Sequence, residues 1–156
     1  MKIATALGLL AAMFSFSASA QTVQIASLDQ AGAESVLRAA KEDARKRNAP
    51  SAIAVVDFAG DLLAFERMDG VRPASTELAI DKARTAARLQ RPTQEIEDNI
   101  NNGRTAFVTA GIMSLRGGVP IVVNGNVVGA VGVAGSNKHT DVDIAKEAAG
   151  VIAARN

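Results

Sequence analysis

The sequence contains no cysteine, tryptophan or tyrosine, and it contains a single histidine, His139. Without thiols, disulfide bonds, iron–sulfur ligation and catalysis by a thiolate are excluded. One imidazole cannot supply the several histidine ligands of a zinc site within one chain. The fold therefore depends on packing, and any chemistry has to come from charged groups, hydroxyls, thioethers and one imidazole.

The chain also lacks a surplus of either charge. It has 17 Lys and Arg against 16 Asp and Glu in 156 residues. Removing the first 20 residues would take away Lys2 and no acidic residue, so 17 − 1 = 16 basic residues would face 16 acidic ones. A neutral chain has no electrostatic footprint for nucleic acid and little attraction to anionic lipid. Small molecules, or other copies of the same chain, are the expected partners.

The first 20 residues have the pattern of an export signal. Lys2 gives a positive start, residues 4–16 form an apolar stretch, and Ala18-Ser19-Ala20 has the small residues of a cleavage site. The apolar stretch is shorter than the roughly 20 residues that cross a bilayer. We expect a signal peptide at residues 1–20, and one mature domain at residues 21–156 that is periplasmic or secreted.

Two pairs of apolar runs, each broken by a turn that contains glycine, predict two antiparallel hairpins. The expected strands span residues 52–58, 62–68, 119–123 and 127–134, and a short edge strand is expected within 107–115. In the last long strand, the spacing of Gly129, Gly132 and Gly135 leaves room for a helix, a ligand or another subunit to approach the backbone.

Apolar residues at helical spacing predict four helices around the hairpins. They span about 29–47, about 75–90, a shorter segment that begins at Thr93, and a last segment that Thr140 opens and that runs through Ile152. The expected fold is α/β, with a mainly antiparallel sheet of about five strands built from two hairpins and with helices packed on it.

Four motifs, in this order, resemble those of the GlcG/HbpS-like heme-binding family. They are Val-Asp-x-x-Gly-x-Leu-x-Ala-Phe-x-Arg-Met-Asp-Gly at 56–70, Lys-Ala-x-Thr-Ala at 82–86, Gly-Gly-x-Pro-Ile at 117–121 and Gly-Ala-x-Gly-Val at 129–133. The resemblance covers nearly all of the mature chain. It implies a five-stranded sheet with helices packed on it, assembly into dimers or larger oligomers, and heme as the suspected cofactor.

Arg67, Asp69 and Lys82 form the first candidate site. Arg67 and Asp69 end one strand on the same side, and Lys82 follows on the apolar seam of the next helix. We expect the three side chains to meet at the rim of a pocket that holds an anion, because a guanidinium can bind a carboxylate through two bonds and a lysine adds a point charge. The alternative is structural: an Arg–Asp pair fixes the turn, and the Lys82 amine reaches water.

Heme would need an iron ligand, and few side chains here can serve. His139 is the candidate metal ligand, because a helix N-terminus keeps an imidazole neutral and able to bind iron. Met68 lies beside Arg67 in the candidate pocket, and Thr85 is a weaker oxygen ligand. The alternatives are an exposed loop histidine and a methionine that fills the core. Ala134 stands where the family usually has serine, so a hydroxyl is missing there.

The expected function is an exported protein that binds heme or another tetrapyrrole and sequesters or senses it as an oligomer. One alternative is an enzyme or accessory protein that acts on a small carboxylated metabolite, as in glycolate-type catabolism. There Arg67 would hold the carboxylate, and Lys82 or Asp69 would move a proton. Another alternative is a structural oligomer without a ligand. The sequence also leaves open whether the pocket lies within one subunit or between two.

Overall fold

The computed structural model describes residues 21–135 and 137–153, and the expected signal peptide lies outside the described residues. The strands are β1 (Ala52–Asp57), β2 (Leu62–Arg67), β3 (Gly118–Val123) and β4 (Asn126–Ala134). They form one sheet in the order β2-β1-β4-β3, and every neighbouring pair is antiparallel. Each expected hairpin is present, so both edges of the sheet are the outer strands of hairpins.

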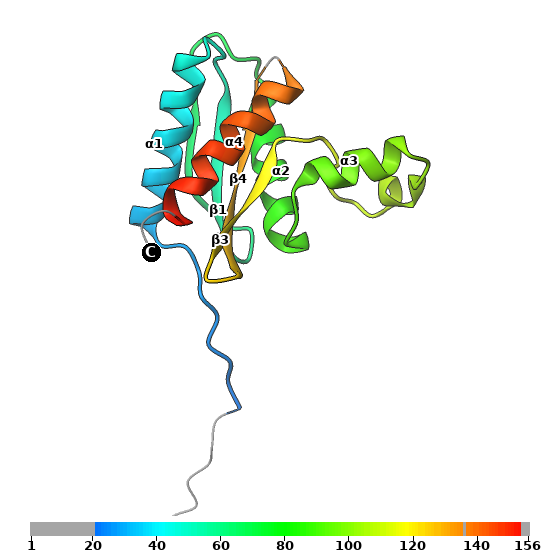
Figure 1. Ribbon diagram of the computed structural model, residues 1–156. Helices are drawn as coiled ribbons and strands as arrows, with labels where there is room; N and C mark the ends of the chain where they lie inside the picture. The colour runs from blue at the N-terminus through cyan, green and yellow to red at the C-terminus, as the bar shows by residue number, and fades with distance from the viewer. Residues whose placement is uncertain (1–20, 136, 154–156) are drawn as a thin grey trace, which may run out of the picture.

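Helices cover both faces of the sheet (Figure 1). They are α1 (Gln30–Lys46), α2 (Ser75–Leu89), α3 (Thr93–Asn101), the short 3₁₀ helix η1 (Thr105–Thr109) and α4 (Lys138–Ala153). Helices α1 and α4 lie side by side on one face, and α2 packs on the other. Helix α3 and η1 extend away from the sheet as an arm. In the described part of the chain, no helix is both long and apolar enough to span a bilayer.

The expected fold class is confirmed: the sheet is antiparallel, is built from two hairpins and carries helices on it. The described residues contain four strands, where about five were expected. The expected edge strand within 107–115 is absent, and residues 105–109 form η1 instead. The hydroxyl of Thr109 donates to the carbonyl of Ala106 at 2.9 Å, and such local bonds compete with strand pairing.

The last helix begins earlier than Thr140. Helix α4 starts at Lys138, and the side-chain oxygen of Asn137 accepts hydrogen bonds from the backbone N–H groups of His139 at 2.9 Å and Thr140 at 3.3 Å. Asparagine is among the strongest N-cap residues because its side chain satisfies these otherwise unpaired donors. Thr140 therefore lies in the first turn of α4, and the capping role predicted for it was wrong.

The two faces of the sheet carry side chains of different size. The face under α1 and α4 presents branched residues, among them Ile53, Val55, Ile121, Val131 and Val133. The face under α2 presents small residues, Ala52, Ala54, Ala130 and Ala134, and α2 meets them with Ala79, Ala83, Ala86 and Ala87. Small side chains on both surfaces let the backbone of α2 come very close to the sheet.

Two glycines mark the closest contact between α2 and the sheet. A Cβ atom on Gly132 of β4 would lie 2.1 Å from the carbonyl oxygen of Ala79, and one on Gly118 of β3 would lie 2.2 Å from that of Lys82. Real Cβ atoms do not approach backbone that closely, so both positions require glycine. The room that the sequence predicted beside Gly132 is filled by a helix of the same chain.

Substitution of Gly132 by alanine is expected to destabilise the fold by about 1–3 kcal/mol, because the added methyl group pushes α2 off the sheet. Denaturant unfolding followed by circular dichroism measures the change. Gly150→Ala is the matched control: a Cβ at this exposed position of α4 meets nothing within 4 Å, so stability should stay equal or rise by up to about 1 kcal/mol. Equal stability of both variants would contradict the close contact.

Candidate functional site

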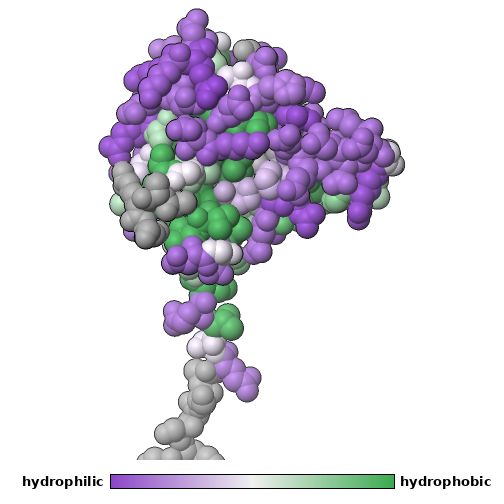
Figure 2. Space-filling view, in the orientation of Figure 1, coloured by the Kyte–Doolittle hydropathy of each residue, from purple (hydrophilic) through white to green (hydrophobic). Residues whose placement is uncertain are grey.

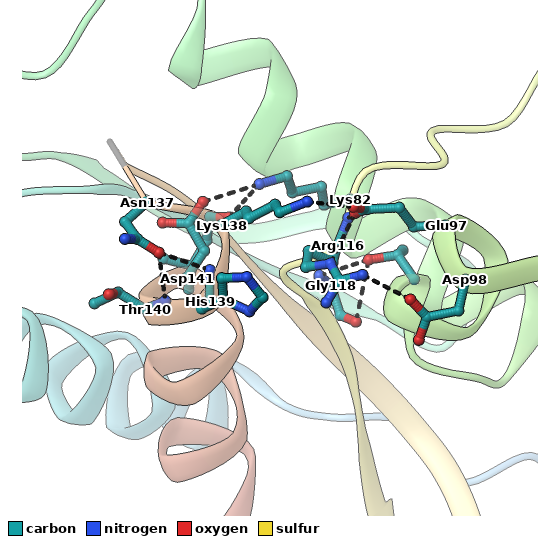
Figure 3. A network of polar contacts seen from close by, with 12 residues as sticks. Lys82, Glu97, Asp98, Arg116, Gly118, Asn137, Lys138, His139, Thr140 and Asp141 are labelled. Carbon is teal, nitrogen blue, oxygen red and sulfur yellow. Dashed lines mark hydrogen bonds and ion pairs between the residues drawn. The ribbon is translucent and has the colours of Figure 1, made fainter. Parts of the chain in front are cut away.

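Lys82 lies in α2 with its side chain turned under the helix, and it is only 4 % exposed. Its ε-amine donates a hydrogen bond of 2.8 Å to the carbonyl of Val133 in β4 and lies 3.2 Å from Oδ2 of Asp141 in the first turn of α4 (Figure 3). The other oxygen of Asp141 accepts a hydrogen bond of 2.8 Å from the backbone N–H of Gly135. One buried ion pair therefore connects α2, the end of β4 and the start of α4.

Burial changes the acidity of both members of this pair. Burial lowers the pKa of Lys82, and the nearby charge of Asp141 opposes that shift. Burial raises the pKa of Asp141, and the charge of Lys82 and the hydrogen bond from Gly135 oppose it. Both shifts favour the uncharged forms, because a low-dielectric site penalises charge. Transfer of a proton from the amine to the carboxylate therefore costs less here than between exposed groups.

A second ion-pair cluster holds the arm against the body of the molecule (Figure 3). The backbone N–H of Arg116, just before β3, donates to the Glu97 carboxylate at 2.7 Å, and its guanidinium reaches Glu97 at 3.0 Å and Asp98 at 2.6 Å. Lys138 of α4 lies 3.4 Å from the other oxygen of Glu97. Arg116 and Glu97 are largely buried, so the cluster links α3 to β3 and α4.

A hollow of about 280 Å³ lies between these two groups of charges. Its walls are formed by Arg72, Leu78, Lys82, Glu97, Leu115, Arg116, Ala134, Gly135, Lys138 and Asp141. Lys82 and Arg116 form ion pairs with the largely buried carboxylates of Asp141 and Glu97. Arg72 and Lys138 are exposed. Arg72 donates to the carbonyl of Gly135 at 3.1 Å, which leaves further N–H donors of its guanidinium for a ligand.

Arg72 also borders a second hollow of about 280 Å³, which is lined by Pro50, Gly70, Val71, Arg72, Ser75 and Gly135. Arg72 and Gly135 belong to both hollows. The guanidinium therefore stands between two neighbouring depressions. Lys138 also lines the first hollow, so the rim offers two cations to a carboxylate, and two leucines of that hollow, Leu78 and Leu115, supply apolar surface.

The structure does not bring Arg67 and Asp69 to Lys82. Arg67, Met68 and Asp69 line a different hollow of about 260 Å³ together with Arg45 and Glu66. Strand β2 is an edge strand and β1 separates it from β4, whereas Lys82 is directed towards β4 and α4. The predicted common rim of Arg67, Asp69 and Lys82 is therefore absent in a single chain.

The other three candidates, Met68, Thr85 and His139, lie in three different places. The Met68 sulfur accepts a 3.4 Å hydrogen bond from the backbone N–H of Ser51, and its side chain packs against the core under α1 and α4. The Thr85 hydroxyl accepts a 3.1 Å bond from the backbone N–H of Met113, beside a separate hollow of about 350 Å³. His139 is exposed in the first turn of α4, next to Lys138. Of the proposed iron ligands, only His139 adjoins in sequence an exposed cation that lines the Lys82 hollow, namely Lys138.

Reasoning from the sequence missed Asp141 and Arg72. Asp141 carries a usable signal, since it is an acidic residue in the first turn of a helix, but that position alone points to the helix dipole and not to a lysine 59 residues away. Arg72 follows the Arg-Met-Asp-Gly motif by two residues, and nothing in its spacing indicates that it reaches Gly135.

Comparison with known proteins gives consistent matches. The model of the family described as "Haem degrading protein HbpS-like" matches residues 28–150. Protein GlcG of Escherichia coli (strain K12) is 50% identical over 107 residues, which cover 68% of this chain and 80% of GlcG.

Solved structures share the fold. The crystal structure of HbpS superposes with a TM-score of 0.78 at 34% identity and covers 85% of this chain and 94% of that one. The crystal structure of the PduOC:heme complex superposes with a TM-score of 0.71 at 27% identity and covers 80% and 94%.

Substitution of Lys82 by methionine is expected to cost about 3–5 kcal/mol of stability, because it leaves the Asp141 carboxylate buried without its partner. Denaturant unfolding measures the loss. The double variant Lys82→Met/Asp141→Leu removes both charges and should recover part of it. Losses that simply add in the double variant would show that the two groups do not interact.

The Glu97 cluster predicts a pH dependence. Burial alone would raise the pKa of Glu97, but hydrogen bonds and charge from Arg116 outweigh it and lower this pKa below its ordinary value. The unfolded chain lacks these contacts, so the cluster stabilises the native state above the ordinary glutamate pKa and ceases to do so as the pH falls through the native value. Glu97→Gln should therefore be less stable than the wild type at neutral pH.

The pH dependence of this stability difference, together with the variant Glu147→Gln, provides the control. The stability difference between wild type and Glu97→Gln should shrink as the pH falls from about 5 towards about 3. Glu147→Gln, at an exposed position of α4, should show a much smaller difference across the range. A difference for Glu97→Gln that does not depend on pH would contradict the role of its charge.

Proposed function

The chain belongs to the HbpS-like family, and from that premise we propose that it binds heme, or a closely related tetrapyrrole, as an exported oligomer. The PduOC:heme complex has the same fold, which supports this class of ligand. The observation on which the proposal rests is the rim of the hollow beside Lys82, where Arg72 and Lys138 are exposed next to apolar surface.

The chemistry of this rim suits the carboxylated edge of a tetrapyrrole. Heme joins an apolar ring to two propionates, and paired cations bind carboxylates through charge-assisted hydrogen bonds. Arg72 and Lys138 supply those cations, and Leu115, which lines the same hollow, is 48% exposed and offers an apolar contact to a ring.

The size of the hollow indicates how such a ligand would be held. At about 280 Å³ it lies just below the roughly 300–1,000 Å³ of pockets that enclose a small molecule. It fits a carboxylate end and not a whole macrocycle. The ring would then need cover from a second copy of the chain, which the proposed oligomer would supply.

His139 is the iron ligand that we propose. It is one residue from Lys138 on the start of α4, so a single helix end would supply a rim cation and an imidazole. The backbone N–H of His139 is engaged by Asn137, while its ring is exposed. An exposed imidazole is a side chain that can bind heme iron. Bound heme would supply redox-active iron at this position.

The surface supports association with further copies. Hydrophilic side chains cover most of the face shown in Figure 2, but a hydrophobic area lies at its lower end, next to the extended N-terminal segment. Val23, Ile25 and Val122 are large apolar residues exposed to 82%, 57% and 43%. Ile25 and Val122 border one hollow of about 550 Å³. Export is proposed from the signal-like pattern of residues 1–20.

Titration of the purified protein with hemin tests the proposal. We expect a saturable Soret change whose position differs in His139→Ala, because the iron loses an imidazole ligand. Arg72→Gln should weaken hemin binding by about tenfold, since one charge-assisted hydrogen bond is lost. Absorbance spectra and the fitted dissociation constants measure both effects.

Arg67→Gln is the matched control, because it removes an exposed arginine that lines a separate hollow. Its hemin affinity should equal that of the wild type. Absence of saturable binding in the wild type would contradict the function. Unchanged spectra in His139→Ala, or equal effects of Arg67→Gln and Arg72→Gln, would contradict the proposed placement.

A further inference from the structure

We propose that Lys82 is a nucleophilic amine that captures small aldehydes or ketones bearing a carboxylate, as a Schiff base in the hollow, with Asp141 as its proton-transfer partner. Heme bound at the rim would not use the amine of Lys82 or the carboxyl of Asp141, so this inference does not depend on the proposed function. It rests on the burial of the amine, its hydrogen-bond partners and the cations around it.

The amine is placed to react with a molecule in the hollow. Lys82 lines that space, and two of the three N–H positions of its ammonium are taken by Val133 and Asp141. Among the described residues the third has no partner. The carboxyl of Asp141 lies 3.2 Å from the amine, within the distance at which a general acid or base exchanges protons.

The burial that positions the amine also favours its reactive form. Only an uncharged amine attacks a carbonyl carbon, and desolvation lowers the pKa of Lys82. Asp141 is suited to hold the displaced proton, because burial raises the pKa of its carboxyl. Exposed lysines such as Lys146 lack both the buried surroundings and the adjacent buried carboxyl.

The chemistry is a condensation without oxidation or reduction. A proton passes from the Lys82 ammonium to Asp141, and the amine nitrogen forms a bond to the carbonyl carbon of the ligand. The nitrogen then loses a proton and the carbonyl oxygen gains one, which gives a carbinolamine. Asp141 returns its proton to that hydroxyl, the carbon–oxygen bond breaks, and water leaves. The products are a protonated imine on Lys82, a carboxylate on Asp141 and one water molecule.

The rim selects for a carboxylate on the ligand. Arg72 is close enough that its charge lowers the pKa of Asp141, against the larger effect of burial, and both residues line the hollow. Arg72 and Lys138 would bind a carboxylate while the carbonyl group reaches Lys82. A space of about 280 Å³ admits a molecule of a few carbon atoms.

Reductive trapping tests the inference. The wild-type protein is incubated with succinic semialdehyde or with butanal, its uncharged counterpart, together with cyanoborohydride, and adducts are located by peptide mass spectrometry. We expect Lys82 to be the main site for succinic semialdehyde, ahead of the exposed lysines, and to react with it about tenfold faster than with butanal. Arg72→Gln should bring the ratio of the two rates close to one.

Three variants identify the groups. Lys82→Arg keeps the positive charge and should abolish the adduct, whereas Lys146→Arg, on an exposed face of α4, should retain it. Asp141→Asn should slow trapping at Lys82 by at least tenfold. Modification of surface lysines in proportion to exposure, with Lys82 unmodified in the wild type, would overturn the inference whether or not every variant folds.

Discussion

The site depends on the close contact between α2 and the sheet at Gly118 and Gly132. Small side chains on both surfaces allow this approach, and it brings the long side chain of Lys82 beneath the helix to the carbonyl of Val133 and the carboxyl of Asp141. A larger residue at either glycine would lift the helix and separate these groups. The packing of glycine and alanine therefore sets the position of Lys82, the most buried cation among the described residues.

The charges of the hollow fall into two classes with different roles. Lys82 and Arg116 are buried and paired, and they hold α2 and α3 to β3, β4 and α4. Arg72 and Lys138 lie at the exposed rim and keep bonding capacity for a ligand. Buried pairs contribute little net stability but cost much when broken, so they fix a geometry more than they strengthen it. This division lets one small hollow be rigid inside and open to a ligand at its rim.

Local patterns predicted the hairpins, the helices and the position of Lys82 on the apolar seam of its helix, because alternation, turn residues and apolar spacing report structure within about 20 residues. They could not identify Asp141 as its partner, since the two lie 59 residues apart and meet only when β4 pairs with β1 and carries α4 to α2. The sequence also placed Arg67 beside Lys82, because Arg67 ends one strand and Lys82 lies on the apolar seam of the next helix. The strand order instead puts β1 between β2 and β4.

The central claim is that Lys82 and Asp141 form one buried, interacting pair in the hollow. Nuclear magnetic resonance of the Lys82 amine nitrogen and the Asp141 carboxyl carbon across a pH titration tests it most directly. The account predicts that Lys82 titrates below the ordinary lysine range and Asp141 above the ordinary aspartate range, with each signal sensing the other's titration. Two independent titrations at ordinary values would contradict it.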